Sequence, residues 1–178
     1  MKRFALYGWA LLFLSGLSFC QPADEDIKKK VVYKGPMAET HDLLTLYSDS
    51  AKLRIKLTSP LQLQYESGDG VYPKGINLVF LDEKGGVNNT VRANYGKYIR
   101  QKDMYIIRGN VVVHNPNKEE TLRTEELQWD RQTRKIFTEK FVTIQTKEDI
   151  LKGYGMTANQ DFTNWKITKP TGVFTLQQ

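Results

Sequence analysis

Cysteine and histidine are nearly absent from this chain of 178 residues, which holds one cysteine, Cys20, and two histidines, His41 and His114. A single cysteine cannot form an internal disulfide, and two scattered histidines do not supply the ligands of a zinc site. The sequence also contains no Gly-x-Ser-x-Gly motif and no glycine-rich phosphate loop. These motifs mark serine hydrolases and nucleotide-driven proteins. We therefore expect a protein with no enzyme activity, no cofactor and no metal.

One-sided charge is also missing. The formal net charge is +6, and basic and acidic residues are interspersed along the chain. The only basic run is 28–30, whereas nucleic-acid binding needs a basic stripe with stacking aromatic rings. The sequence predicts no nucleic-acid partner and a solvated surface of mixed charge.

Beyond the N-terminus no segment has a helical apolar stripe, and apolar residues instead alternate with polar ones. Val111 and Val113 are one example, and 53–57 and 61–65 are others. A period of two with many Val, Ile, Thr and aromatic residues indicates strands that bury one face. We expect an all-β domain, with 53–57 and 61–65 as separate strands and one or two helical turns over 38–46.

Three ungapped repeats make up the C-terminal half: 91–113, 122–144 and 151–173. Only the joints between them differ in length, which is typical of one structural unit used several times. Equivalent positions hold apolar residues: Val91, Leu122 and Leu151; Tyr98, Trp129 and Ala158; Tyr105, Ile136 and Trp165; Val113, Ile144 and Val173. Each unit is expected to be a strand hairpin that stacks on the next.

Turns and bends are expected at fixed places in each repeat. The segments 101–103, 131–134 and 161–164 are predicted hairpin turns, 115–118 the long joint, and Gly109-Asn110 a further turn. Between 93 and 96, 124 and 127, and 153 and 156 the apolar spacing is three rather than two. An odd step reverses the faces unless a β-bulge absorbs one residue, so we expect a bulge or bend there in every repeat.

The N-terminus has the pattern of a secretory leader. Lys2 and Arg3 precede an apolar run over 4–19, and Cys20 follows. Sixteen helical residues span about 24 Å, less than the ~30 Å hydrocarbon layer. A cysteine at this point resembles a lipoprotein processing site, which makes Cys20 a lipidation candidate. The alternative is an uncleaved membrane anchor. The sequence predicts a leader helix over 1–20, a tether over 21–45 and a β domain over 46–178.

Several phrases resemble the LptC family of lipopolysaccharide-export proteins, in particular its Bacteroidetes-like branch. The resemblance covers about residues 45–176 and rests on 109–113, 122–130, 136–144 and 153–159, with 72–76 and 82–85 upstream. It implies a twisted, open antiparallel β-jelly roll whose interior carries acyl chains. It also implies a periplasmic location tethered to the inner membrane. Implied partners are lipopolysaccharide, the inner-membrane ABC transporter (LptF/LptG-like subunits with an LptB-like ATPase) and an LptA-like bridge protein.

An apolar groove requires large inward side chains in register, and the repeat positions supply them. The candidates for the lipid groove are Tyr98, Tyr105, Ile107, Val111, Val113, Leu127, Trp129, Ile136, Val142, Ile144, Met156, Trp165 and Ile167. Each of them is also compatible with ordinary core packing. Arg131 and Gln132, in a predicted turn, are expected outside this interior, and Val173 and Phe174 are candidates for an edge that pairs with a partner.

Two questions remain open in the sequence. Arg92, Arg123 and Lys152 share one repeat position, which fits either contact with lipid phosphates or a solvated outer face; the outer face is favoured. A jelly-roll glycosidase or carbohydrate-binding lipoprotein, or a purely structural envelope lipoprotein, is the alternative function. Carbohydrate recognition predicts a cluster of exposed aromatic rings on one flat face.

Overall fold

A computed structural model describes residues 33–172. The chain divides into two units, residues 1–34 and Gly35–Gln178, and nearly all of the described residues belong to the second. The predicted leader helix, Cys20, Val173 and Phe174 lie outside the described residues. Within residues 33–172, no helix has the length and hydropathy needed to cross a membrane.

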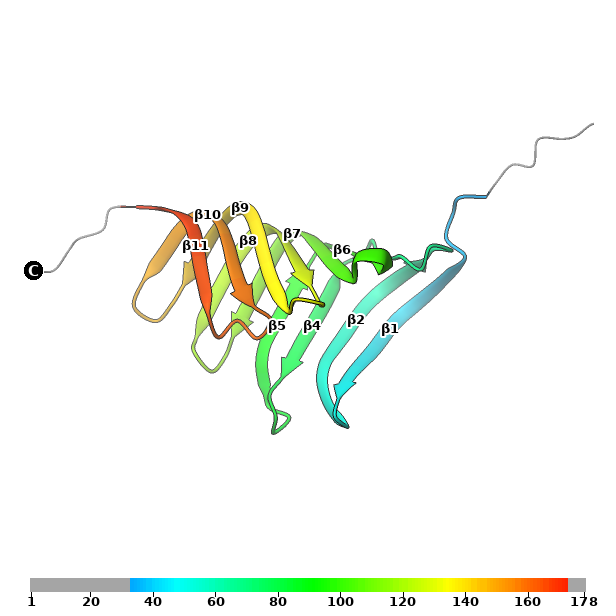
Figure 1. The fold of residues 1–178 in the computed structure, drawn as a ribbon, viewed down its shortest axis with the longest axis horizontal. Coiled ribbons are helices and arrows are strands. Elements are labelled where there is room, and N and C mark those ends of the chain that lie inside the picture. Colours follow the sequence, from blue (N-terminus) through cyan, green and yellow to red (C-terminus); the bar gives the residue numbers. More distant parts are fainter. Residues whose placement is uncertain (1–32, 173–178) are drawn as a thin grey trace, which may run out of the picture. The chain divides into compact units, whose positions relative to one another are not determined.

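The second unit is built from strands and one short 3-10 helix, which confirms the all-β prediction (Figure 1). The elements are β1 (Ala38–Asp49), β2 (Lys52–Gln64), β3 (Gly70–Tyr72), β4 (Ile76–Leu81), β5 (Val87–Ala93), β6 (Tyr95–Ile99), η1 (Arg100–Lys102), β7 (Met104–Asn115), β8 (Glu120–Asp130), β9 (Lys135–Gln145), β10 (Ile150–Asn159) and β11 (Trp165–Thr171).

All eleven strands join one antiparallel sheet, in the order β11-β10-β9-β8-β7-β5-β4-β2-β3-β6, with β1 on the free side of β2. Strand β2 pairs with β4 through one part of its length and with β3 through the other. Strand β7 pairs in the same way with β5 and β6. Thus β3 and β4 lie end to end, as do β5 and β6, and the sheet is a simple meander.

The three repeats are three successive hairpins, as the sequence predicts. The first and last apolar positions of a repeat face each other: Val91 pairs with Val113, and Leu122 with Ile144. Pairing between hairpins continues these positions into rows across the sheet. One row runs Leu57, Leu78, Val91, Val113, Leu122, Ile144, Leu151, and a second runs Tyr98, Tyr105, Trp129, Ile136, Ala158, Trp165.

A line of irregularities crosses the sheet where the odd apolar spacing occurs, and we call it the crease. The strand is interrupted at Asn94 between β5 and β6, and the register shifts between Thr124 and Gln128 and between Tyr154 and Met156. Positive φ values mark the crease, including 96° at Gly75 and 72° at Gly155. Bulges bend strands and increase their twist. The predicted bend in every repeat is therefore confirmed.

Three local predictions are wrong, in each case because contacts with a distant segment set the local conformation. Residues 38–46 are not helical but form most of β1, which pairs along β2, so the sheet extends into the range predicted as tether. Strand β2 is continuous through Ser59-Pro60, because the Ser59 hydroxyl donates to the carbonyl of Gly75 at 2.7 Å across the crease. Gly109-Asn110 is a bulge inside β7 rather than a turn.

The crease divides the sheet into two layers that face each other. The first layer ends in a rim of turns at 50–51, 82–86, 116–119 and 146–149, and the second in a rim at 65–69, 100–103, 131–134 and 160–164. Contacts across the gap hold the layers together. The hydroxyls of Tyr47 and Tyr105 lie 2.6 Å apart, and the rings of Phe80 and Trp129 pack edge to face at 5.6 Å.

Candidate functional site: a groove between two sheet layers

The predicted groove residues all lie in or against the space between the layers. Ten of them belong to a single buried cluster: Tyr105, Ile107, Val111, Val113, Leu127, Trp129, Ile136, Val142, Ile144 and Met156. The other three, Tyr98, Trp165 and Ile167, are partly buried and pack against that cluster. The sequence thus identifies the inward face of the sheet. It does not distinguish a packed core from a lipid-binding surface.

The interior is closely packed along most of its length. One internal cavity of about 20 Å³ lies among side chains that include Leu78, Ile107, Leu127 and Ile136, and a second of the same size lies beside Val113, Leu122 and Ile144. Each has room for about one water molecule. Neither of these two cavities has space for a fatty acyl chain.

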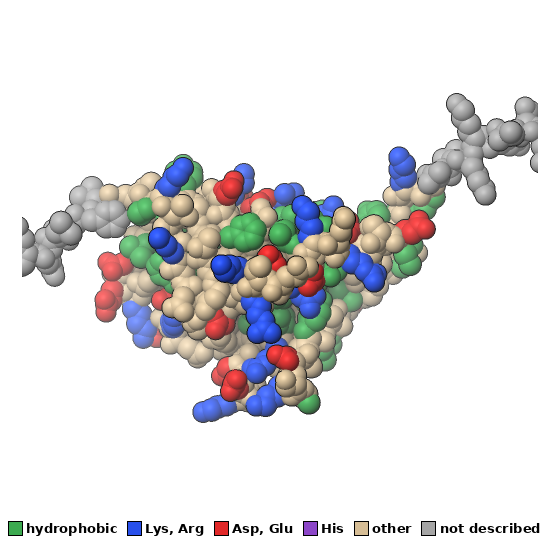
Figure 2. Space-filling view, viewed as in Figure 1, with side chains coloured by type: hydrophobic (Ala, Val, Ile, Leu, Met, Phe, Trp, Pro, Cys, Tyr) green, Lys and Arg blue, Asp and Glu red, His purple; other side chains and the backbone are tan. Residues whose placement is uncertain are grey.

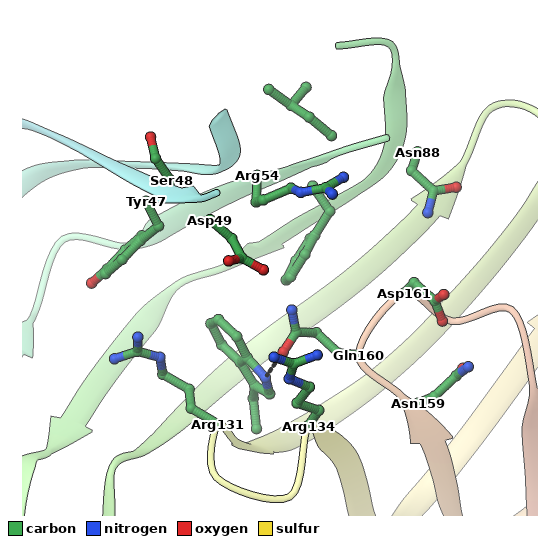
Figure 3. A pocket seen from close by; sticks show the side chains of 13 residues that line it. Tyr47, Ser48, Asp49, Arg54, Asn88, Arg131, Arg134, Asn159, Gln160 and Asp161 are labelled. Carbon is green, nitrogen blue, oxygen red and sulfur yellow. Dashed lines mark hydrogen bonds between the residues drawn. The ribbon is translucent and has the colours of Figure 1, made fainter. Parts of the chain in front are cut away.

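An open cleft of about 560 Å³ lies where the two rims separate (Figure 3). Its first wall comes from the β1–β2 hairpin and β4, with Tyr47, Arg54 and Phe80 among its residues. Its second wall comes from the second rim, with Trp129 and the turn that follows it. The rings of Phe80 and Trp129 line both this cleft and the first internal cavity, so this edge-to-face pair separates the two spaces.

Three arginines surround the cleft. Arg131 lies with its guanidinium 5.1 Å from the ring centroid of Tyr47 and 6.0 Å from that of Trp129, and its Nη1 donates to Asp103 at 3.0 Å. Cation–π contacts of this kind join the second rim to β1. Arg131 is not part of the buried cluster, and its side chain lies at the mouth of the open cleft between the layers.

Arg54 and Arg134 are less engaged. Arg54 contacts Glu83 at 3.5 Å, and the Glu83 side chain is 80% exposed, so this ion pair is weak. Among residues 33–172, none of the ion pairs involves Arg134. Asp49 and Asp161 also line the cleft, and their carboxylates reduce its positive charge. The cleft combines guanidinium donors with an aromatic floor.

A tyrosine cluster lies beside the cleft in the interior. Burial, with Tyr47 close by, raises the pKa of Tyr72 to about 12. Burial also raises the pKa of Tyr105 well above its usual value, and burial together with the hydrogen bond to Asp103 raises the pKa of Tyr98. These phenols therefore stay neutral at physiological pH. The Tyr98 hydroxyl donates to Asp103 Oδ1 at 2.9 Å, and the Tyr105 hydroxyl shares a hydrogen bond with that of Tyr47.

The outer face of the sheet carries the repeated cationic position. Arg92, Arg123 and Lys152 are exposed there, in one row across β5, β8 and β10. They point away from the interior, so the favoured interpretation as a solvated outer face is confirmed. Figure 2 shows basic and acidic side chains interspersed on the visible face.

Several cleft residues were missed by the sequence reasoning. Arg54, Phe80 and Gln160 come from three distant segments, and Phe162, from a predicted turn, is only 5% exposed. The alternation in 53–57 and 76–81 marks Phe80 as inward-facing, but nothing in the sequence brings these segments beside 159–161. No cluster of metal-ligating side chains occurs among the residues that the structure describes.

The creased sheet with its apolar interior and open cleft defines an open antiparallel β-jelly roll. The model of the LptC family, described as lipopolysaccharide-assembly, LptC-related, matches residues 3–169. The chain therefore belongs to the LptC family, whose role is in lipopolysaccharide transport and which is not a known enzyme family. A search of curated proteins finds no match.

Proposed function

We propose that this protein accepts lipopolysaccharide from the inner-membrane ABC transporter and passes it along the groove between the sheet layers to an LptA-like bridge protein. The observation that carries the proposal is that a charged cleft and an apolar interior adjoin each other. The arginine-lined cleft meets continuous apolar rows of the sheet at Trp129.

The apolar rows suit the acyl chains of the substrate. Exposing an acyl chain of about fourteen carbons to water costs on the order of 10 kcal/mol, at ~0.8 kcal/mol per methylene. Several chains on one molecule make an unprotected passage through the periplasm prohibitive. A groove removes this barrier without chemistry, and the driving force comes from the transporter, because the sequence has no phosphate-binding loop of its own.

The arginines of the cleft suit the acidic headgroup. Guanidinium groups bind phosphate and carboxylate oxygens in bidentate geometry. Arg54 and Arg134 are the best placed, since one has a weak ion pair and the other has none among the described residues. We assign headgroup contact to these two side chains, and contact with the acyl chains to Trp129, Ile136 and the other groove candidates.

Free sheet edges suit the bridge. Among residues 33–172, strand β1 pairs only with β2, and β11 only with β10, so within this range each presents one unpaired edge. Such edges associate readily with further strands. We propose that like-folded domains of the transporter and the bridge protein pair with them, with Val173 and Phe174 continuing the β11 edge. A periplasmic location and membrane attachment through the leader or an acylated Cys20 belong to the same proposal.

The carbohydrate-binding alternative is less well supported. It predicts a flat platform of exposed aromatic rings. Phe141 and Tyr154 are exposed on the outer face of β9 and β10, but their planes meet at 68° in an edge-to-face pair. Such a pair does not offer two coplanar rings to a sugar.

Site-specific photo-crosslinking in cells tests the proposal. A photo-crosslinking residue at Tyr47 or Arg134 in the cleft, and at Ile136 in the interior, is expected to capture lipopolysaccharide. The same residue at Arg123 on the outer face is the control and should capture none. Adducts at Arg123 without adducts at the inward positions would overturn the carrier function. Mass spectrometry of the mature N-terminus separately decides between an acylated Cys20 and an intact leader.

A further inference from the structure

One loop of the second rim crosses the groove and fills it. Residues 160–164, which we call the plug loop, join β10 to β11. Phe162 at its centre is 5% exposed, although a loop side chain ordinarily faces solvent. Its ring lines both internal cavities, so it lies between them and interrupts the apolar interior.

The plug loop is attached to the opposite layer by two side chains. Asn89 of β5 donates from Nδ2 to the carbonyl of Asp161 at 2.6 Å, and Lys118 of the first rim donates from Nζ to the carbonyl of Thr163 at 3.1 Å. Together with Phe162 these bonds close the space between the rims beside the open cleft. The closed part is the continuation of the groove toward β11.

The closed position of the loop includes two unfavourable features, a positive φ and a buried oxygen without a hydrogen-bond partner. Phe162 has a φ of 53°, in the left-handed region that residues other than glycine and asparagine seldom adopt. Asn89 is fully buried, and its Oδ1 has no hydrogen-bond partner. Buried polar atoms are nearly always paired, and an unpaired one destabilises the arrangement that contains it. Opening the space between the layers lets water reach Asn89 Oδ1, which lowers the cost of releasing the loop, whereas the φ of Phe162 belongs to the loop itself and is the same in both positions.

The loop also has the internal structure of a unit that moves as a whole. Asp161 Oδ1 accepts from the backbone and the hydroxyl of Thr163, and Asn159 Oδ1 accepts from the backbone of Asn164. These bonds do not involve the opposite layer. They survive when the ties to Asn89 and Lys118 break.

We propose that the plug loop is a gate: Phe162 occupies the groove when it is empty, and the loop swings outward when acyl chains replace the ring. The inference rests on the proposed carrier function and adds its regulation. When the loop opens, an acyl chain takes the place of the Phe162 ring among the apolar side chains of the groove. The groove is therefore filled by an apolar group in both states.

Locking the loop tests the gate. The full chain carrying Cys20→Ser, Lys118→Cys and Thr163→Cys is joined by a short bis-maleimide, and a photo-crosslinking residue at Ile136 reports loading of purified lipopolysaccharide. We expect the locked protein to load at least tenfold more slowly than the same protein without the linker. Each single-cysteine variant treated with the linker is the control and should load at the unlocked rate.

Releasing the loop is the complementary arm. Lys118→Ala removes one tie from an exposed turn and is expected to speed loading several-fold. Lys84→Ala removes the same charge from the 82–86 turn of the first rim, where none of the ion pairs of the described residues involves Lys84, and should have no effect. Locked and unlocked proteins that load equally fast would overturn the gate and leave the carrier function intact. A wild-type protein that never loads would overturn the carrier function and the gate together.

Discussion

Trp129 is the side chain whose removal tests the construction of the groove most directly. It is 7% exposed, stacks on Tyr105 at 5.4 Å, meets Phe80 edge to face at 5.6 Å, and donates from Nε1 to Gln160 at 3.3 Å. It therefore connects both layers of the sheet and the plug loop. Replacing it by alanine removes all of these contacts at once.

The expected cost follows from this environment. Truncating a buried tryptophan to alanine destabilises a protein by about 3–5 kcal/mol. For a domain of this size such a loss lowers the melting temperature by roughly 10–15 °C. Trp129→Phe keeps most of the ring packing and loses the hydrogen bond to Gln160, so we expect about 1–2 kcal/mol. The order of stability is wild type, then Trp129→Phe, then Trp129→Ala.

Urea denaturation followed by far-ultraviolet circular dichroism measures the free energy of unfolding. Tyr154→Ala is the matched control, because Tyr154 is 54% exposed and its one ring partner among residues 33–172 is Phe141, a pair worth about 0.5–1.5 kcal/mol. A loss below about 1 kcal/mol for Trp129→Ala would show that the ring does not pack between the layers. The same variant removes one of the two rings that separate the cleft from the first cavity, so fluorescence of an apolar dye should rise.

Two further predictions concern charge and pH. The double variant Arg54→Ala, Arg134→Ala should weaken lipopolysaccharide binding about a hundredfold, since each of the two lost hydrogen bonds to a charged group contributes about 1.5 kcal/mol. Arg123→Ala on the outer face should leave binding unchanged, and equal losses at both places would contradict a specific headgroup site. Buried tyrosines should make the protein sensitive to base. Because the folded state raises the pKa of Tyr72 to about 12 and also raises that of Tyr105, the stability they contribute is complete below about pH 10. It is lost as pH rises toward 12, by about 1.4 kcal/mol per pH unit for each group. Urea denaturation between pH 9 and 11 measures how the free energy of unfolding changes with pH. The double variant Tyr72→Phe, Tyr105→Phe should show a smaller change, and an unaltered pH dependence would refute its assignment to these two tyrosines.

Much of the sheet was predictable because its signals are local. Alternation at 104–113 and 135–145 specifies strands and their inward faces, and the repeated spacing specifies that three units have the same form. The odd step in each repeat predicts a bend at one place, and pairing between identical units turns equivalent positions into rows. Trp129 and Ile136 were thus identifiable as inward-facing residues of one hairpin, whereas their direct pairing depends on a strand register that the sequence leaves open.

Local signals failed where pairing with a distant segment decides the conformation. Residues 38–46 have a weak local preference, and β2 alone makes them a strand. Pro60 reads as a break between two strands, yet Ser59 bonds across the crease to Gly75 and keeps β2 continuous. In both places the partner lies many residues away, so no window of the sequence contains the cause.

The sequence by itself determined the alternation, the repeat and the faces, since each depends on residues within one or two strands. Only the tertiary structure decided how the creased sheet closes upon itself. That closure places Arg54 opposite Arg134, sets Arg131 against Tyr47, and turns Phe162 from a loop residue into a buried plug. A period of two fixes the side of a strand on which a residue lies. It carries no information about which side chains meet across the gap, because those contacts join segments about fifty to a hundred residues apart.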